Sequence, residues 1–104
     1  MVAEMTRSYR ILYSDGVMRL DMSKAHTLKF VMVSPVASLT LTDIVAGRLY
    51  VVLFEQSVTT PVTIFNCPQM LNLTPINPMR GSVTVQSFLG LQTGQLASAM
   101  PASF

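Results

Sequence analysis

The chain is built from short runs of β-branched and aromatic residues, separated by Gly, Pro, Asn and Asp. The runs recur at intervals of about eight to twelve residues, a spacing typical of β-sandwiches and β-barrels. No segment repeats its apolar residues with the 3.6-residue period of an amphipathic helix. The sequence therefore predicts an all-β fold, a single small β-sandwich or jelly roll of about seven to eight strands.

The clearest turn signal is Asp15–Gly16, which lies between the apolar runs 9–13 and 17–22. Asp-Gly between two such runs favours a tight β-hairpin turn, because glycine adopts positive φ angles without steric cost. We therefore expect these two runs to form a hairpin.

A second pair of strands is predicted from residues 28–33 and 37–41. Leu39 and Leu41 alternate with Ser and Thr, so we expect both leucines to face the core. After a turn at 43–47, the apolar run 48–56 is the strongest strand of the chain. Its weak alternation predicts burial on both faces, in a central strand or one that lies under a neighbouring subunit.

The remaining strands are predicted to be shorter or more irregular. Residues 62–65 favour a short strand and residues 69–74 a weak one, followed by a Pro-rich connection over 75–81. Proline removes a ladder donor, so edges and loops are expected there. Residues 82–89 alternate with period two, and we expect Val83, Val85 and either Ser87 or Leu89 to face inward.

The whole chain, 1–104, is expected to form one domain with extended terminal arms. Residues 1–8 show no firm strand pattern and are assigned to an N-terminal arm, and residues 92–104 to a small, polar C-terminal tail. Each arm either frays, as chain ends often do, or docks Phe104 or Met1 onto an adjacent copy.

Charge is distributed unevenly along the sequence. Charged residues make up 12% of the chain, and eleven of the twelve precede Gln56, so that Arg80 is alone in the second half. An average soluble domain has about a quarter of its residues charged. The surface of the second half is therefore expected to be covered, by a membrane or by other protein subunits.

A membrane is the weaker of these alternatives. The second half has no apolar run near the roughly 20 residues that a spanning helix needs, and prolines and amides interrupt it. The N-terminus lacks the apolar region of a signal peptide, so we expect a complete, soluble, self-assembling chain that forms a homo-oligomer. Four residues are predicted at protein interfaces: Arg80, Phe88, Met100 and Phe104. Arg80 alternatively occupies a solvated loop tip.

No pattern of catalytic or ligand-binding residues is present. Cys67 is the sole cysteine and His26 the sole histidine, and the five acidic residues show no short-spaced pair. We therefore predict no enzyme activity, catalytic residue, metal or cofactor. The seven basic residues are scattered rather than clustered, which disfavours nucleic-acid binding.

Three segments, 39–42, 47–56 and 60–64, resemble β-rich modules of tailed-bacteriophage virion proteins. The resemblance covers about a third of the chain: a Leu-Thr-Leu-Thr strand, a Gly turn with a long apolar strand ending in Gln, and a Thr-Val-Thr type strand. It departs at Phe65, where such modules often have tryptophan.

The resemblance implies a virion structural protein, made in the host cytoplasm and located on the outer capsid surface. For so small a chain it favours a capsid cement or decoration protein, a trimer or dimer that stabilises contacts between major capsid protein subunits. One alternative is a tail, head-fibre or spike module that binds a host surface or another tail protein. A second is a small ligand-binding β-sandwich.

Overall fold

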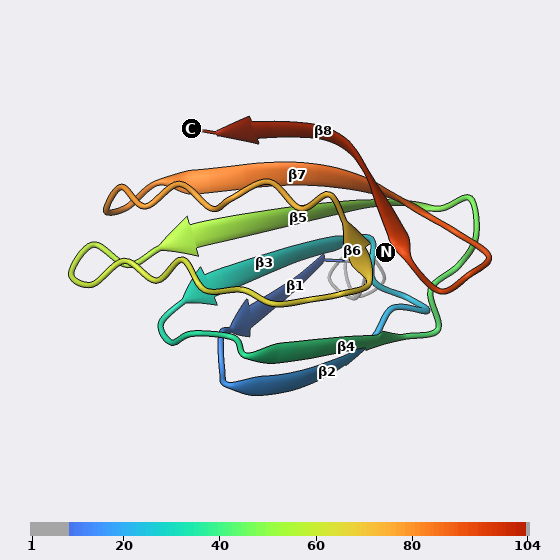
Figure 1. Cartoon of the computed structure of the whole chain (residues 1–104), viewed down its shortest axis with the longest axis horizontal. Coiled ribbons are helices and arrows are strands. Elements are labelled where there is room, and N and C mark those ends of the chain that lie inside the picture. The colour runs from blue at the N-terminus through green and yellow to red at the C-terminus, as the bar shows by residue number, and fades with distance from the viewer. Residues whose placement is uncertain (1–8, 104) are drawn as a thin grey trace.

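The computed structural model describes residues 9–103, with side chains up to residue 98 (Figure 1). It confirms the all-β class, because this part of the chain contains strands and no helix. The strand count also agrees with the prediction. The eight strands are β1 (Tyr9–Tyr13), β2 (Val17–Asp21), β3 (Thr27–Met32), β4 (Ser38–Thr42), β5 (Leu49–Gln56), β6 (Met70–Leu71), β7 (Val83–Gly90) and β8 (Leu96–Ser103).

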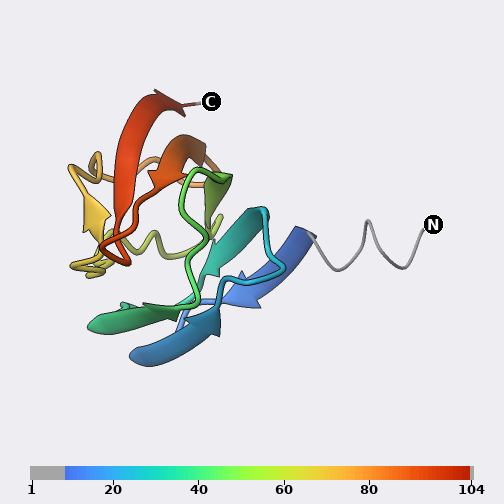
Figure 2. The same cartoon turned by 90° about the vertical axis from the view of Figure 1, so that its right-hand side faces the viewer.

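The strands form two sheets of very different size. Six strands make a mixed sheet in the order β1-β3-β5-β7-β8-β6, and β2 and β4 make a parallel pair. In the large sheet β1, β3 and β5 are parallel, whereas β7 is antiparallel to β5 and to β8. Figure 2 shows the large sheet curling from β1 over β7 and β8 to β6, with β2 and β4 below it.

The first five strands alternate between the two sheets. The chain passes from β1 in the large sheet to β2 in the small one, back to β3, across to β4, and back to β5. Each connection is therefore an arch between sheets, and successive passes stack in parallel. The predicted hairpin of residues 9–13 and 17–22 does not form, because β1 pairs with β3 and β2 with β4. The second predicted pair of strands, β3 and β4, is likewise divided between the two sheets.

The Asp15–Gly16 turn illustrates the correction. Gly16 is not among the glycines with positive φ, so the turn lacks the backbone geometry of the predicted tight hairpin. Instead the Gly16 carbonyl accepts hydrogen bonds from the backbone N–H groups of Ala37 and Ser38. The Asp15–Gly16 turn is therefore part of the arch between β1 and β2, and the Gly16 carbonyl links this arch to the start of β4.

Ser14 and Ser34 join the arch between β1 and β2 to the arch between β3 and β4 by side-chain hydrogen bonds. The Ser14 hydroxyl accepts hydrogen bonds from the N–H groups of Val33 and Ser34 and donates to the Ser34 carbonyl, at 2.7–2.9 Å. The Ser34 hydroxyl donates in return to the Ser14 carbonyl at 2.7 Å. Because arches interrupt the strand ladders, these bonds satisfy backbone groups that would otherwise lack partners.

The faces of the central strands differ from the prediction. β5 lies between β3 and β7, as expected for a central strand, but only one of its faces is fully buried and the other is half-buried. On β7 the expected orientation is wrong: Thr84, Gln86 and Phe88 are buried, whereas Val83 and Val85 point away from the core. The physical reason is that the inward polar groups of β7 have backbone partners inside the molecule, as described below.

Strand β8 lies where the sequence pattern indicated a tail. Residues 96–103 pair with β7, with an irregularity between Gln86 and Phe88, and the start of β8 also pairs with β6. Beyond Ala97 no described strand pairs with the second edge of β8, and an edge without a partner tolerates a proline such as Pro101. The predicted N-terminal arm 1–8 and Phe104 lie outside the described residues.

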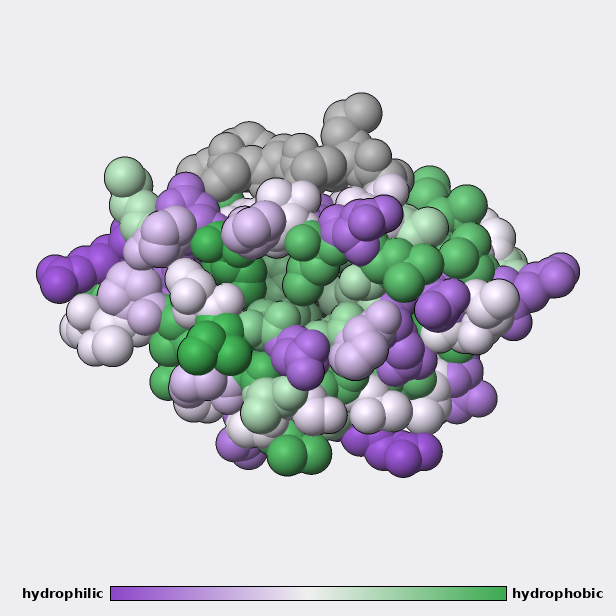
Figure 3. Space-filling view, in the orientation of Figure 1, coloured by the Kyte–Doolittle hydropathy of each residue, from purple (hydrophilic) through white to green (hydrophobic). Residues whose placement is uncertain are grey.

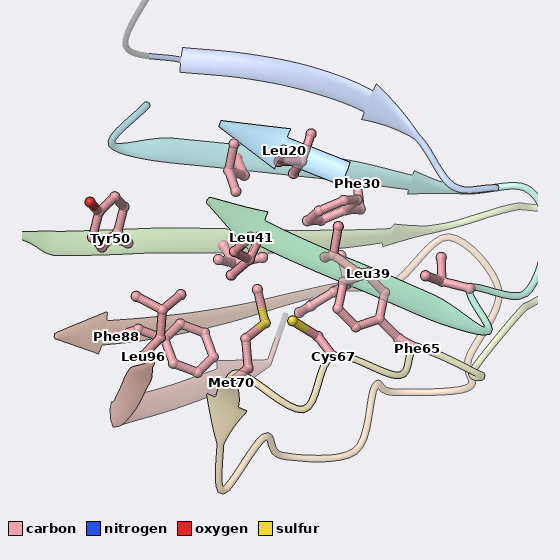
Figure 4. Close-up of a cluster of buried hydrophobic side chains, with 14 of the residues drawn as sticks. Leu20, Phe30, Leu39, Leu41, Tyr50, Phe65, Cys67, Met70, Phe88 and Leu96 are labelled. Atoms are coloured by element: carbon pink, nitrogen blue, oxygen red, sulfur yellow. The ribbon is translucent and has the colours of Figure 1, made fainter. Parts of the chain in front are cut away.

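The core lies between the two sheets (Figure 4). Phe30, Phe54 and Phe65 pack together within it. Phe30 on β3 stacks on Phe54 of β5, and Phe65 packs edge-on against both, with ring centroids 4.7–4.9 Å away. Edge-to-face pairs of this kind add to the stabilisation that burial of apolar area supplies. Leu39 and Leu41 of β4 are buried, as predicted.

Phe65 belongs to a long irregular segment, residues 57–82, which we call the excursion. It runs back along the molecule from the end of β5, contributes the two-residue strand β6, and returns to β7 (Figure 1). The predicted strand at 62–65 is reduced to a single bridge between Phe65 and Val36. The neighbouring Asn66 exchanges backbone hydrogen bonds with Val36 and Leu39, so the excursion extends the small sheet.

Glutamine side chains supply the hydrogen bonds that strand pairing does not. The amide of Gln56 pairs with both the N–H and the carbonyl of Val62, each at 2.7 Å. Gln86 pairs in the same two-fold way with Thr74, at 3.0 and 2.7 Å. Each amide therefore acts as a β-bridge partner.

Gln69 makes the third such pair, but here the glutamine lies on the excursion and its backbone partner on a strand. The Gln69 amide binds both backbone groups of Leu41 on β4, at 2.6 and 2.8 Å. Gln56 and Gln86 are almost fully buried, where an unpaired amide would carry a large desolvation cost. Among the described side chains, no buried nitrogen or oxygen lacks a hydrogen-bond partner.

Candidate assembly interface

The most distinctive surface is the side of the large sheet that faces away from the core, which we call the outer face. Strand register arranges its side chains in rows across β1, β3, β5 and β7. Fourteen positions of these strands face outward, and all but Thr27, Lys29, Glu55 and Ser87 are apolar or aromatic. The fourteen are Tyr9, Ile11 and Tyr13 on β1, Thr27, Lys29 and Val31 on β3, Leu49, Val51, Leu53 and Glu55 on β5, and Val83, Val85, Ser87 and Leu89 on β7.

The outer face carries little net charge. Its two charged residues, Lys29 and Glu55, form an ion pair with a nitrogen–oxygen distance of 3.3 Å. Both partners are partly exposed, so the pair contributes little to the stability of the isolated chain. Its effect is to leave the middle of an apolar surface electrically neutral.

Exposure on the outer face is high along β1 and at Leu49 and Leu89, and lower in the middle of the face. Tyr9, Ile11 and Tyr13 are 41%, 53% and 67% exposed, whereas Val51, Leu53 and Val85 are half-buried among their neighbours. Contiguous exposed apolar surface of this kind commonly marks a protein contact. On the opposite side, which carries the excursion, apolar and polar residues are interspersed (Figure 3).

β1 is also an open edge of the sheet. In a β-strand, successive residues direct their backbone N–H and carbonyl groups to opposite edges. The Ser14 N–H donates to the Val31 carbonyl of β3, so Arg10 and Leu12, at even spacing from Ser14, also direct their backbone groups to β3. Tyr9, Ile11 and Tyr13 direct theirs away from β3, where no described strand lies. An edge of this kind is a template for pairing with another strand.

The edge of β2 in the small sheet offers a contrast. By the same alternation, fixed by the bond from the Met22 N–H to the Thr42 carbonyl, β2 directs the backbone of Val17, Arg19 and Asp21 to its open edge. Two of these three residues are charged. Charges on an edge strand oppose pairing with a second strand, so β2 is protected where β1 is not.

A hollow of about 490 Å³ lies beside β1. It is open to solvent, its lining is polar and apolar in about equal parts, and Asp21 is the acidic residue among them. The hydrogen bond from the Ser23 backbone N–H is the main cause that lowers the pKa of Asp21. The Asp21 carboxylate therefore has a structural role, since it accepts a hydrogen bond in the turn that ends β2. The lining consists of Tyr9, Arg10, Ile11, Asp21, Ser23, Lys24 and Ala25.

Of the four predicted interface residues, the structure describes the side chains of Arg80 and Phe88, and only that of Arg80 is exposed. Arg80 is exposed in the turn before Gly81, in the position of a loop tip. Phe88 has 0% of its surface exposed and packs in the core, so its side chain cannot reach a partner, which corrects its assignment. Met100 lies on β8, but its side chain falls outside the described part, as does all of Phe104.

The residues weighed for chemistry are dispersed in the structure. Cys67 is buried, and burial raises the pKa of its thiol. His26 is exposed between β2 and β3, where its carbonyl accepts from the Val51 N–H. Over residues 9–98 no group of three or more His, Cys, Asp or Glu side chains could hold a metal ion. The described residues also include no helix long and apolar enough to cross a membrane.

The residues of β1 that form this surface were not identified from the sequence as interface residues. The available signal was the alternation of Tyr9, Ile11 and Tyr13 with Arg10 and Leu12. Alternation shows that two faces exist, but both contain apolar residues here. Only the parallel pairing with β3 decides which face is outward and which backbone groups remain open.

Comparisons with protein-family models, with curated proteins and with solved structures give no match to this chain. The resemblance of residues 39–64 to phage virion modules therefore rests on the sequence alone.

Proposed function

We propose that the chain is a non-enzymatic structural protein of a virion, a cement or decoration protein of the capsid. The single observation that supports this best is the outer face, an apolar and nearly uncharged sheet surface on a chain with few charges overall. The phage-like segments of the sequence direct the proposal towards a virion. The finer architecture belongs to the same proposal: a small β-sandwich in which β2 and β4 cover the large sheet.

The mechanism is clamping by repeated contacts. The outer face would lie against major capsid protein subunits, and the Lys29–Glu55 pair would bring no net charge to the contact. An interface of standard size removes about 1,600 Å² of surface from water. Many copies on one lattice raise the overall avidity although each contact is weak.

The proposal is tested by imaging purified particles and by binding the isolated protein to particles that lack it. We expect copies on the outer capsid lattice and a higher temperature of capsid disruption when the protein is bound. Val85→Lys places a charge on the outer face and is expected to abolish both effects. Thr40→Lys, on the exposed side of β4, is the matched control and should bind as the unmodified chain does.

Three outcomes would contradict the proposal. Absence of the protein from the capsid lattice would exclude a cement role, and confinement to the tail or to one vertex would indicate a tail or fibre module instead. Unchanged binding by Val85→Lys would show that the outer face is not the contact surface.

A further inference from the structure

We propose that two copies of this chain associate through β1, antiparallel and centred on Ile11, so that two six-stranded sheets become one continuous sheet. This inference deepens the proposed function, because it names the surface through which copies associate. Its evidence is the geometry of β1 itself.

The first argument is the direction of the backbone groups. Tyr9, Ile11 and Tyr13 direct their N–H and carbonyl groups to the open edge. An antiparallel partner centred on Ile11 places Ile11 opposite the same residue of the other copy, and Tyr9 opposite Tyr13. Residues opposed in this way exchange both of their backbone hydrogen bonds. The register therefore satisfies every open group of the strand.

The second argument is the side-chain pattern. β1 reads Tyr-Arg-Ile-Leu-Tyr, which is nearly the same in both directions about Ile11. A two-fold interface brings the same patch of each copy together, so a palindromic strand matches itself. The opposed side chains would be Ile11 with Ile11 and Tyr9 with Tyr13, all on the outer face. Aromatic and β-branched pairs are favourable cross-strand contacts.

The third argument is charge. Arg10 is the one charged residue of β1, and in this register it faces Leu12 of the other copy rather than a second arginine. The same arrangement on β2 would centre on Arg19 and bring two arginines face to face, which is destabilising. The charges therefore favour self-pairing at β1 and oppose it at β2.

The consequence for the outer face is direct. A two-fold axis perpendicular to the sheet keeps the outer faces of both copies on the same side. The apolar surface available to a capsid would then double without a gap. Two other occupants of the edge, a strand of a different protein and a third copy, are separate outcomes of the test.

The primary experiment is sedimentation of the full chain over a series from low-micromolar to millimolar concentration. We expect the mass to rise to twice 11.4 kDa. Ile11→Lys buries a charge at the two-fold axis and should leave the monomer mass at every concentration. Val17→Lys changes a residue on the β2 edge that is even more exposed and is the matched control, expected to dimerise normally. Circular dichroism and thermal unfolding establish that both variants fold.

Cross-linking tests the register independently. Opposed residues in a hydrogen-bonded antiparallel pair have Cα atoms about 5.5 Å apart, within the range that a disulfide spans. With diamide as the oxidant, Ile11→Cys should form a covalent dimer, and Val17→Cys should not. The native Cys67 is buried and remains common to both variants.

Each contrary result overturns a defined part of the inference. A monomer throughout the series, a trimer, or a dimer that survives Ile11→Lys would each exclude the β1 dimer. Loss of particle binding by a monomeric chain on Ile11→Lys would assign the edge to a different protein. A β1 dimer that does not bind particles would leave this inference standing and would overturn the proposed function.

Discussion

The stacked arches of residues 9–56 and the excursion of residues 57–82 find hydrogen-bond partners for their backbone groups in different ways, although both pack around the same core. The arches do so with parallel backbone ladders, whereas the excursion relies on a two-residue strand and on side-chain amides. The comparison shows that the charge-poor second half of the chain is polar inside. Gln56 and Gln86 bind backbone groups of the excursion, and Gln69 binds those of Leu41 on β4, where charged residues would be costly to bury.

The largest effect is expected from Phe54→Ala, because Phe54 joins the two regions. Its ring contacts Phe30 of the arches and Phe65 of the excursion. Truncation of a buried phenylalanine typically lowers the free energy of unfolding by about 3–5 kcal/mol. Urea denaturation followed by fluorescence and circular dichroism should show both regions losing stability together. The exposed Val58→Ala is the control, and an equally small effect of Phe54→Ala would contradict the packing.

A smaller and more local effect is expected from Gln86→Leu. The change removes both partners of the Thr74 backbone while β7 keeps its ladder. Loss of partners for such groups costs about 2–3 kcal/mol. Hydrogen exchange should become faster at the Thr74 amide than at the amides of β3. Gln92→Leu, an exposed change, is the control. Equal loss of protection in both regions would show that the excursion does not depend on this amide.

Ser14→Ala tests the opposite region. The variant removes the hydroxyl that accepts from the N–H groups of Val33 and Ser34, and we expect a loss of about 1–2 kcal/mol. Exchange of these two amides should accelerate, while the Thr74 amide keeps its protection. Ser38→Ala, at an exposed position, provides the comparison. Equal acceleration of exchange at the Thr74 amide would mean that the arches and the excursion do not depend on separate sets of hydrogen bonds.

The smallest effect is a dependence of stability on alkaline pH. Burial raises the pKa of the Cys67 thiol above its ordinary value of 9.0. The folded state therefore keeps a proton that the unfolded state loses, so this contribution is full below pH 9.0 and declines as the pH rises through the folded pKa. Stability measured from pH 8 to pH 10.5 should fall more steeply for the unmodified chain than for Cys67→Ala. Parallel curves would contradict a buried thiol.

The fold class could be predicted from the sequence because strand composition and spacing are local properties. The strand count, the central place of β5 and the inward orientation of Leu39 and Leu41 follow from such patterns. Strand pairing does not follow from local patterns, because a Gly-containing turn can close a hairpin or carry the chain across to a second sheet. Asp15–Gly16 favours the first on local grounds, and contacts distant in sequence select the second.

Two further features depended on distant partners. β7 turns Thr84 and Gln86 inward because the excursion offers backbone groups for them to bind, although hydrophobicity alone favours Val83 and Val85. β8 is rich in Ala and Ser, a composition with low strand propensity, and forms because β7 has an open edge. The candidate interface on β1 was missed for the same reason, since its outward face is defined by pairing with β3.

The parallel course of the two outermost long strands determines how the molecule would respond to tension. β1 and β8 run in the same direction, and the described chain enters at the start of β1 and leaves at the end of β8. A force that pulls these two points apart acts along the strands, so the hydrogen bonds of each ladder share the load in shear instead of opening one after another. Mechanical strength would then exceed what the modest size of the core suggests.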